Sequence, residues 1–164
     1  MAAAADRARS RTAGRAWALV ALVTAVVIGL DQLTKALVRE SIVRGEERRL
    51  LPGVQLVDTR NHGVAFGFFT SNQTVVTILI GIALLVLLTF FTRNTTIALI
   101  WLPTGMLLGG ALGNVLDRLR SGSVTDFVKL PLGWPPFNLA DAAITIGIVL
   151  LFLVVEHARR DTAR

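Results

Sequence analysis

The sequence predicts an integral membrane protein that is mainly α-helical, with four transmembrane helices and a small extracytoplasmic β-sheet. The 164 residues are 53% hydrophobic and only 17% charged, which is too apolar for the surface of a soluble domain of this size. The mean hydropathy is +0.63, and the apolar residues gather in blocks long enough to cross a bilayer. Two of the connections between these blocks contain segments that resemble strands.

The first predicted helix begins at Ala16, where an apolar run starts that continues to Val38. Residues 1–15 are rich in alanine and arginine, and we expect them to form a disordered cytoplasmic tail. A cleaved signal peptide would need small residues directly after its apolar core, and residues 29–32 do not supply them. We therefore expect this helix to be a membrane span that is retained.

Three further apolar runs predict the remaining helices, at residues 74–91, 97–112 and 139–155. The second of these contains Pro103 and several glycines, which membrane helices tolerate and which let neighbouring helices approach closely. We expect residues 16–156 to form a single four-helix membrane domain. A polar cytoplasmic tail follows at residues 157–164.

The two longer connections each contain a strand-like segment. Residues 54–60 alternate in polarity and are followed by a possible glycine turn at residues 61–63 and a short apolar piece at residues 64–66, a pattern typical of a hairpin. Residues 124–130 form the second such segment. We expect both on the same side of the membrane, in a small sheet above the helices.

The arginines of the N-terminal tail predict the orientation. An even number of spans places both termini on one side of the membrane, and Lys and Arg are equally numerous on the two predicted sides. The positive-inside rule gives most weight to the residues around the first helix, so the tail favours cytoplasmic termini. The net charge of +6 therefore indicates contact with anionic lipid rather than with nucleic acid. The four arginines of the tail are Arg7, Arg9, Arg11 and Arg15.

The chain contains no cysteine, and its two histidines are His62 and His157. This composition excludes disulfides, a thiolate nucleophile and a cysteine metal site. A zinc site would have to consist mostly of carboxylates, which zinc seldom favours. The sequence thus predicts neither a metal nor a cofactor.

Polar side chains inside the predicted spans are candidates for function, because they are expensive in lipid. Asp31 and Lys35 are four residues apart on one helix face, and we interpret them as a neutralised structural pair. Asn114, Asp117 and Arg118 share a face of the third helix. Their side chains either join neighbouring helices through polar contacts or orient the side chains of a neighbouring functional site.

Two aspartates suggest acid–base chemistry. Asp126 lies in an apolar strand-like segment, where burial is expected to raise its pKa, and Asp141 begins the fourth helix with Asn138 placed to cap it. Two neighbouring carboxylates can share one proton, as in aspartic proteases, so that one activates water while the other protonates a carbonyl oxygen. The residues leave two alternatives open: a proton relay in a small proton-coupled transporter or channel subunit, and a noncatalytic assembly protein.

Five segments resemble, in order, the motifs of the lipoprotein signal peptidase, or signal peptidase II, family. The matching pieces are Asp31-Gln32-x-x-Lys35, Asn61-x-Gly63-x-Ala65-Phe66, Gly110-Ala111-x-Gly113-Asn114-x-x-Asp117-Arg118, Thr125-Asp126-Phe127 and Phe137-Asn138-x-Ala140-Asp141. Five motifs in the family's order are far more specific than one, and they lie within residues 17–155. The departures, at His62, Val64 and Ala142, do not affect the two aspartates.

The resemblance implies an aspartic endopeptidase of the bacterial inner membrane, with four spans and both termini cytoplasmic. Its substrates would be prolipoproteins whose cysteine carries diacylglycerol, cut just before that cysteine, in contact with membrane lipid. No metal or nucleic-acid partner is expected, and a monomer would suffice. The resemblance makes Asp126 and Asp141 the catalytic pair, and its supporting or substrate-binding positions are Asn61, Gly63, Asn114, Asp117, Arg118, Asn138 and Ala140.

Overall fold

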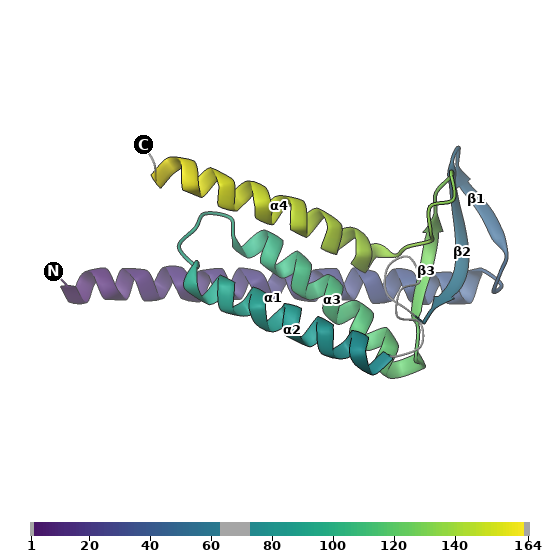
Figure 1. Ribbon diagram of the computed structural model, residues 1–164, viewed down its shortest axis with the longest axis horizontal. Coiled ribbons are helices and arrows are strands. Elements are labelled where there is room, and N and C mark those ends of the chain that lie inside the picture. The colour runs from purple at the N-terminus through teal and green to yellow at the C-terminus, as the bar shows by residue number, and fades with distance from the viewer. Residues whose placement is uncertain (1, 63–72, 163–164) are drawn as a thin grey trace.

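The computed structural model describes residues 2–62 and 73–162 of the chain. The helices run side by side, and a small antiparallel sheet lies across one end of them (Figure 1), so the mainly helical class with a small sheet is confirmed. In chain order the elements are α1 (Ala2–Ser41), β1 (Glu47–Leu51), β2 (Val54–Asn61), α2 (Gln73–Arg93), α3 (Trp101–Ser121), β3 (Val124–Lys129) and α4 (Leu139–Thr162).

The first helix begins earlier than expected. Residues 2–15, for which we expected disorder, continue α1 without a break, so that expectation was wrong. Alanine and arginine, which dominate this stretch, are among the strongest helix formers. Elongation of an existing helix avoids the cost of nucleation. The helix that forms over the apolar run can therefore extend toward the N-terminus through residues 2–15.

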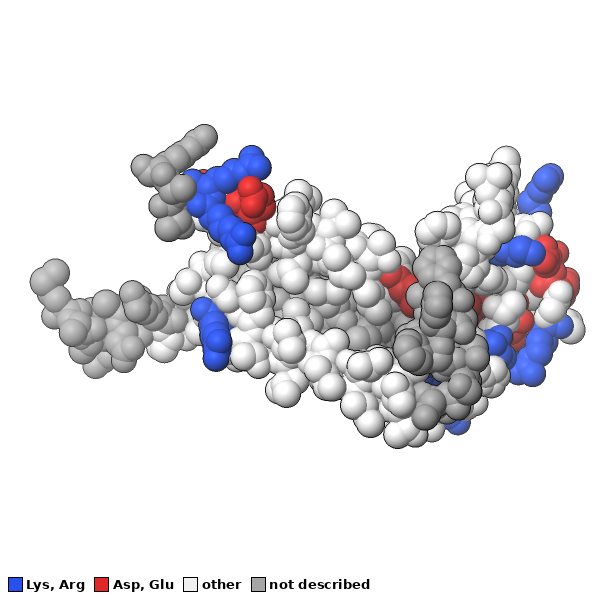
Figure 2. All heavy atoms as spheres, viewed as in Figure 1, with Lys and Arg blue, Asp and Glu red and all other residues white. Residues whose placement is uncertain are grey.

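Three helices are long and apolar enough to cross a membrane by length and composition: α1 over Ser10–Ser41, α2 over Thr74–Arg93 and α4 over Leu139–Asp161. Within the described residues α3 does not meet this criterion, because polar side chains such as Asn114 and Asp117 occupy its second half. Charged residues gather at the two ends of the molecule, and the surface between them is almost uncharged on the face drawn in Figure 2. That pattern agrees with helices that cross a bilayer.

Glycines let α3 pack closely against both α1 and α4. A Cβ atom at Gly109 would lie 2.7 Å from the Cβ of Val27 in α1. A Cβ atom at Gly110 would lie 2.5 Å from the carbonyl oxygen of Ala140 in α4. No side chain fits at these distances, so only glycine allows the three backbones to approach in this way.

The sheet has the order β1-β2-β3, with antiparallel pairing throughout. β2 and β3 correspond to the segments predicted at residues 54–60 and 124–130, and their place in one sheet is confirmed. Asn61 pairs with Val124, and Thr59 pairs with Asp126. This register brings Asn61 next to the strand that carries Asp126.

The edge strand β1 was missed by the sequence pattern. All five of its residues are exposed, and a charged edge strand shows no alternation of apolar and polar residues. It joins β2 through a tight turn in which Gly53 has a φ of 81°, a value that favours glycine. Of the glycine turn predicted at residues 61–63, Gly63 lies outside the described residues, as does the short apolar piece at residues 64–66.

Apolar packing is divided between the two ends of the helices. Near the C-terminal end of α2, Phe91 meets Trp17 of α1 edge to face, with the ring centroids 4.9 Å apart. Beneath the sheet, Val38 and Ile42 of α1 pack with Phe127 of β3. The second cluster attaches the sheet to the helices directly beside the polar residues described next.

Candidate active site

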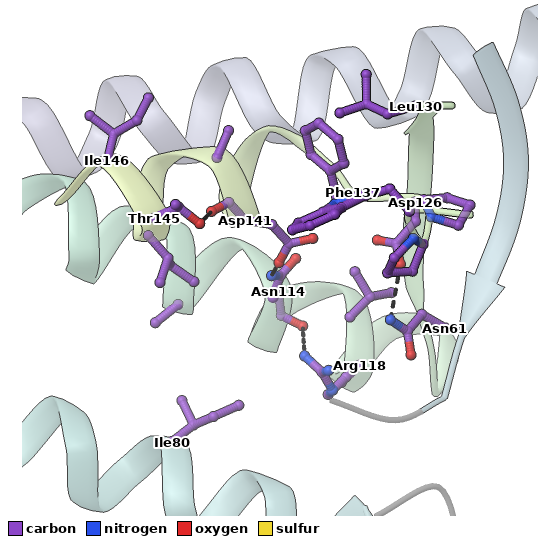
Figure 3. A pocket seen from close by; sticks show the side chains of 17 residues that line it. Asn61, Ile80, Asn114, Arg118, Asp126, Leu130, Phe137, Asp141, Thr145 and Ile146 are labelled. Atoms are coloured by element: carbon purple, nitrogen blue, oxygen red, sulfur yellow. Dashed lines mark hydrogen bonds between the residues drawn. The ribbon is translucent and has the colours of Figure 1, made fainter. Parts of the chain in front are cut away.

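A pocket of about 640 Å³ opens where the sheet meets the ends of α3 and α4 (Figure 3). Most of its wall is apolar, with Ile80 of α2 on one side and Phe137 and Ile146 on the others. A volume of this size is typical of a site that encloses a small molecule or part of a larger substrate. The polar side chains in its lining are those of Asn61, Asn114, Arg118, Asp126, Asp141 and Thr145.

Asp126 lies on β3 and is almost completely buried. Its Oδ1 accepts a hydrogen bond from Nδ2 of Asn138 at 2.7 Å, and its Oδ2 accepts one from Nδ2 of Asn61 at 2.9 Å. Burial raises the pKa of Asp126 to about 6, and the charge of Asp141 adds to the rise, while the two asparagine hydrogen bonds oppose it. The carboxyl group is therefore held firmly and can change its protonation near neutral pH.

Asp141 lies in the first turn of α4, and Asn138 caps that helix as the sequence predicts. The backbone N–H of Asp141 donates to Oδ1 of Asn138 at 2.9 Å, and the backbone N–H of Asn138 donates to Oδ2 of Asp141 at 3.2 Å. This reciprocal arrangement is a capping box. The remaining oxygen of Asp141, Oδ1, accepts a hydrogen bond from Nδ2 of Asn114 at 2.8 Å.

A sharp return of the chain brings the two aspartates to one pocket. After β3, the segment around residues 131–136 reverses direction, and Phe137 pairs with Val128 through backbone hydrogen bonds of 2.8 and 3.0 Å. α4 therefore begins beside β3, and Asp126 and Asp141 both line the same cavity. The sequence predicts this proximity only through the family resemblance, because the return depends on the packing of the loop.

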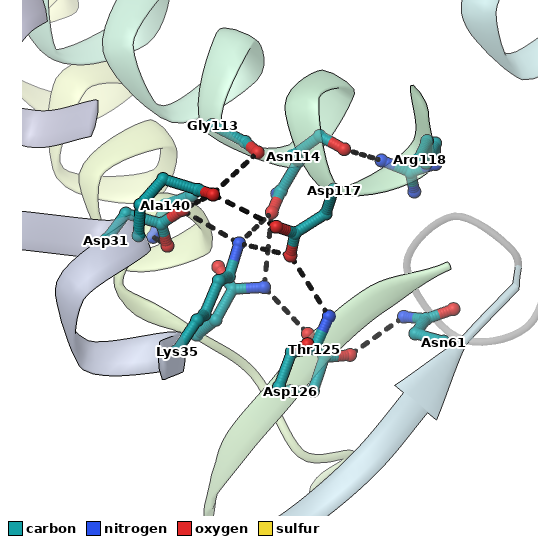
Figure 4. Close-up of polar contacts among 12 residues, drawn as sticks. Asp31, Lys35, Asn61, Gly113, Asn114, Asp117, Arg118, Thr125, Asp126 and Ala140 are labelled. Atoms are coloured by element: carbon teal, nitrogen blue, oxygen red, sulfur yellow. Dashed lines mark hydrogen bonds and ion pairs between the residues drawn. The ribbon is translucent and has the colours of Figure 1, made fainter. Parts of the chain in front are cut away.

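The polar residues of α1 and α3 form one buried network next to the pocket (Figure 4). Asp31 and Lys35 make the expected ion pair, with 2.8 Å between Oδ2 and Nζ, and both side chains are fully buried. Nζ of Lys35 also lies 3.0 Å from Oδ2 of Asp117 and donates to Oδ1 of Asn114 at 2.9 Å. The sequence indicated the pair but not these two further partners on α3.

This network ties the helices to the sheet. Oδ1 of Asp31 accepts the backbone N–H of Ala140 at 3.0 Å, and Oδ2 of Asp117 accepts the backbone N–H of Thr125 at 3.2 Å. Gln32 donates to Oδ1 of Asp117 at 3.0 Å. Sequence reasoning gave Gln32 no role of its own, although a polar side chain inside an apolar helix was a signal that could have pointed to it.

The other predicted site residues have distinct positions. Arg118 lines the pocket and donates from Nη1 to the backbone carbonyl of Asn114 at 3.2 Å. Asn61, predicted as a supporting or substrate-binding position, lines the pocket and donates to Asp126. Gly63 lies outside the described residues. Within residues 2–62 and 73–162 there is no group of three or more histidines and acidic residues that could hold a metal ion.

Two carboxylates on one apolar cavity can perform acid–base chemistry on a bond that water alone attacks slowly. The fold and the site together define a membrane-embedded enzyme. Two solved structures, each described as a bacterial membrane enzyme determined by the in meso method, agree with this class. The first has a TM-score of 0.80 and 28% sequence identity, and the aligned region covers 87% of this chain and 90% of the chain in that structure. The second has a TM-score of 0.75 and 29% sequence identity, and the aligned region covers 83% of this chain and 91% of the chain in that structure.

The chain belongs to the signal peptidase II family, whose model matches residues 23–156. The lipoprotein signal peptidase of Burkholderia thailandensis is 41% identical over 158 residues, which cover 92% of this chain and 94% of the relative. The lipoprotein signal peptidase of Halothermothrix orenii is 35% identical over 136 residues, which cover 82% of this chain and 93% of the relative. The protein is therefore a multi-pass membrane protease.

Proposed function

We propose that this chain is an intramembrane aspartic endopeptidase that removes the signal peptide from diacylglyceryl-modified prolipoproteins, cutting just before the lipidated cysteine. One observation carries the proposal: Asp126 and Asp141 come from different elements, line one apolar pocket and are each held by asparagine amides. Membership of the signal peptidase II family supports the substrate class.

Asp126 and Asp141 form the catalytic pair and share one proton in the resting enzyme. The ionised member removes a proton from a water molecule, whose oxygen attacks the carbonyl carbon of the scissile bond. The protonated member gives its proton to the carbonyl oxygen, which produces a neutral tetrahedral diol. The carboxyl group that took the proton of the water then gives it to the amide nitrogen, the other carboxylate accepts a proton from one hydroxyl of the diol, and the C–N bond breaks. The products are the free amine of the lipidated cysteine and the C-terminal carboxylate of the signal peptide.

The surrounding polar residues support this pair. Asn61 and Asn138 orient Asp126, and Asn114 orients Asp141, each as a donor to a carboxylate oxygen. Correct placement of reacting groups contributes several kcal/mol to catalysis, so these amides matter although they exchange no proton themselves. Three further positions serve the site less directly: Arg118 at the pocket wall, Asp117 through Thr125, and Ala140 through Asp31. Gly63 contributes to substrate binding by the family resemblance.

The apolar wall suits the lipid-bearing part of the substrate. Ile80 of α2 and Ile146 of α4 lie on opposite sides of the pocket (Figure 3), and both helices are apolar enough to face lipid. An acyl chain and the apolar residues of a signal peptide gain free energy from burial against such side chains, about 0.8 kcal/mol for each CH₂ group. A lipidated precursor should therefore bind more tightly than the same peptide without lipid.

In the membrane, α3 serves as the fourth span, with its polar side chains turned toward α1, α4 and the sheet. Its 21 residues would extend about 30 Å, the thickness of the hydrocarbon core. Both termini then lie in the cytoplasm and the sheet lies outside the inner membrane. Residues 16–156 act as one domain, and a monomer suffices because both carboxylates come from one chain. Neither the pocket nor the family supports a proton-coupled transporter.

The test uses the purified full chain in detergent with two precursor peptides that differ only in the diacylglyceryl group. We expect cleavage of the lipidated peptide at the bond before the cysteine, undiminished by a metal chelator. The unlipidated peptide should be cleaved at least tenfold more slowly, since the acyl chains supply much of the binding energy. Cleavage of neither peptide would refute the proposal, and equal cleavage of both would refute the part played by the lipid.

A further inference from the structure

Lys35 is a buried ammonium group that contacts neither aspartate of the pocket. Its side chain is fully buried, and its Nζ is within 3.0 Å of three acceptors: Oδ2 of Asp31, Oδ1 of Asn114 and Oδ2 of Asp117. An ammonium group has three protons and no lone pair, so these partners satisfy all of its donors. Two of the partners are carboxylates that balance its charge, but the third is a neutral amide.

That amide connects Lys35 to the pocket. Oδ1 of Asn114 accepts hydrogen bonds from Lys35 at 2.9 Å and from Asn138 at 3.2 Å, and Nδ2 of Asn114 donates to Oδ1 of Asp141 at 2.8 Å. The reverse orientation would place the NH₂ group against the ammonium and the carbonyl oxygen against the carboxylate of Asp141. Both of those contacts are repulsive, so Lys35 determines which end of the Asn114 amide faces Asp141.

We propose that Lys35 is a positioning residue for the reaction: by holding Oδ1 of Asn114, it directs the NH₂ group of Asn114 at Asp141 and keeps that carboxylate in its reactive orientation. This inference rests on the proposed catalytic role of Asp141. It gives Lys35 a part in the reaction in addition to the ion pair with Asp31.

The neighbouring side chain of Gln32 supplies a matched comparison. Gln32 belongs to the same network and donates to Asp31 at 3.2 Å and to Asp117 at 3.0 Å. Among the described residues, Gln32 forms hydrogen bonds with Asp31, Gly113, Asp117 and Arg120, and none with Asn114. A substitution at Gln32 therefore perturbs the network without acting on the amide that faces Asp141.

Lys35→Met alone would leave two buried carboxylates without their cation, which is strongly destabilising and can prevent folding. The charge-matched variant is Lys35→Met combined with Asp117→Asn. The three ionic groups carry one net negative charge in the natural chain, and Asp31 alone carries the same charge in this variant. Asp117→Asn by itself, which keeps the bond from Lys35 to Asn114, is the reference.

The experiment measures kcat and KM for a lipidated precursor peptide, with and without Asn114→Ala, and thermal melting of every protein. Adding Lys35→Met to Asp117→Asn should lower kcat by about tenfold or more, as the loss of an orienting bond does, and change KM by less than about twofold. In the Asn114→Ala background the same addition should change kcat by less than about twofold, because its route to Asp141 is already gone. Gln32→Leu should change kcat by the same factor in both backgrounds.

An equal loss of kcat in both backgrounds would overturn the positioning role and leave Lys35 as a purely structural group. So would an unchanged kcat in the presence of Asn114. These outcomes are distinct from a failure of the proposed function. If the proposed function is wrong, a well-folded Asp141→Asn protein should remain active. If Asp141→Asn is inactive but the effects of the substitutions at Lys35 and Asn114 are additive, only the positioning role is refuted.

Discussion

The side-chain amide of Asn138 donates to Oδ1 of Asp126 across 2.7 Å, and the Oδ1 of the same amide accepts the backbone N–H of Asp141 across 2.9 Å. One short side chain thus contacts both aspartates of the pocket. Asn138 is fully buried, so its amide has no access to water that could replace either bond. Asn138 therefore couples the position of Asp126 on β3 to the position of Asp141 on α4.

Replacement of Asn138 should impair cleavage more than folding. Asn138→Ala removes the donor to Asp126 and the helix cap of α4, and we expect turnover to fall about tenfold to a thousandfold. The matched control is Asn94→Ala, which removes a 2.7 Å bond to the backbone oxygen of Phe90 at the end of α2. Cleavage assays and thermal melts of both proteins are the measurement. A similar loss of turnover in both would contradict a specific role for Asn138.

The aspartates themselves should be indispensable. Asp126→Asn and Asp141→Asn should each abolish cleavage while the proteins still fold, because asparagine is nearly isosteric but cannot exchange the required proton. Because the two carboxylates act on one water as a unit, the double variant should be hardly slower than either single one. Cleavage of a lipidated precursor by the three variants measures this, with thermal melting as the folding control. Substantial turnover by either well-folded single variant would remove that residue from the mechanism.

The raised pKa of Asp126 predicts a pH dependence of stability. Burial raises its pKa from 3.8 to about 6, so between these values the folded protein binds more protons than the unfolded chain. The stability contributed by protonated Asp126 is therefore present below about pH 4 and lost as the pH rises through about 6. Asp126→Asn cannot ionise at this position. The Tm of the variant minus the Tm of the natural protein should therefore increase from about pH 4 to pH 7. A Tm difference that stays constant over this range would contradict the shift.

The contact between α3 and α4 should tolerate no side chain at Gly110. A Cβ atom there would lie 2.5 Å from the carbonyl oxygen of Ala140, so Gly110→Ala should destabilise the protein by about 1–3 kcal/mol and displace the start of α4. Gly81 of α2 has no atom within 4 Å of such a Cβ. Gly81→Ala should be neutral or stabilising by up to about 1 kcal/mol. Melting temperatures and cleavage rates compare the two, and equal behaviour would contradict the tight packing.

The orientation in the membrane can be tested with reporters. A reporter fused after Arg164 should be cytoplasmic, and one inserted near Glu46, between α1 and the sheet, should be extracytoplasmic. The physical reason is the group of arginines before the first apolar run, which favours retention of that end on the cytoplasmic side. The opposite pattern would overturn the proposed topology, and two reporters on the same side would contradict an odd number of crossings between them.

The features that could be predicted from sequence are those that depend on neighbours in the chain. The cap of Asn138 on α4 spans three residues, and the pair of Asp31 and Lys35 spans one helical turn. The strand at residues 54–60 follows from alternation. The charged edge strand β1 and the helical residues 2–15 were missed, because neither stretch has a periodic pattern of apolar residues in its sequence.

By itself, the sequence determined a membrane protein of largely helical class, the residues able to do chemistry and, through five ordered motifs, the family. Only the tertiary structure decided how those residues meet. Lys35 and Asn114 are 79 residues apart, and Asn61 and Asp126 are 65 apart. Such contacts depend on how closely α3 packs against its neighbours and on where the chain turns after β3. Spacing along a chain cannot specify these, because the contacts arise from the packing of whole elements.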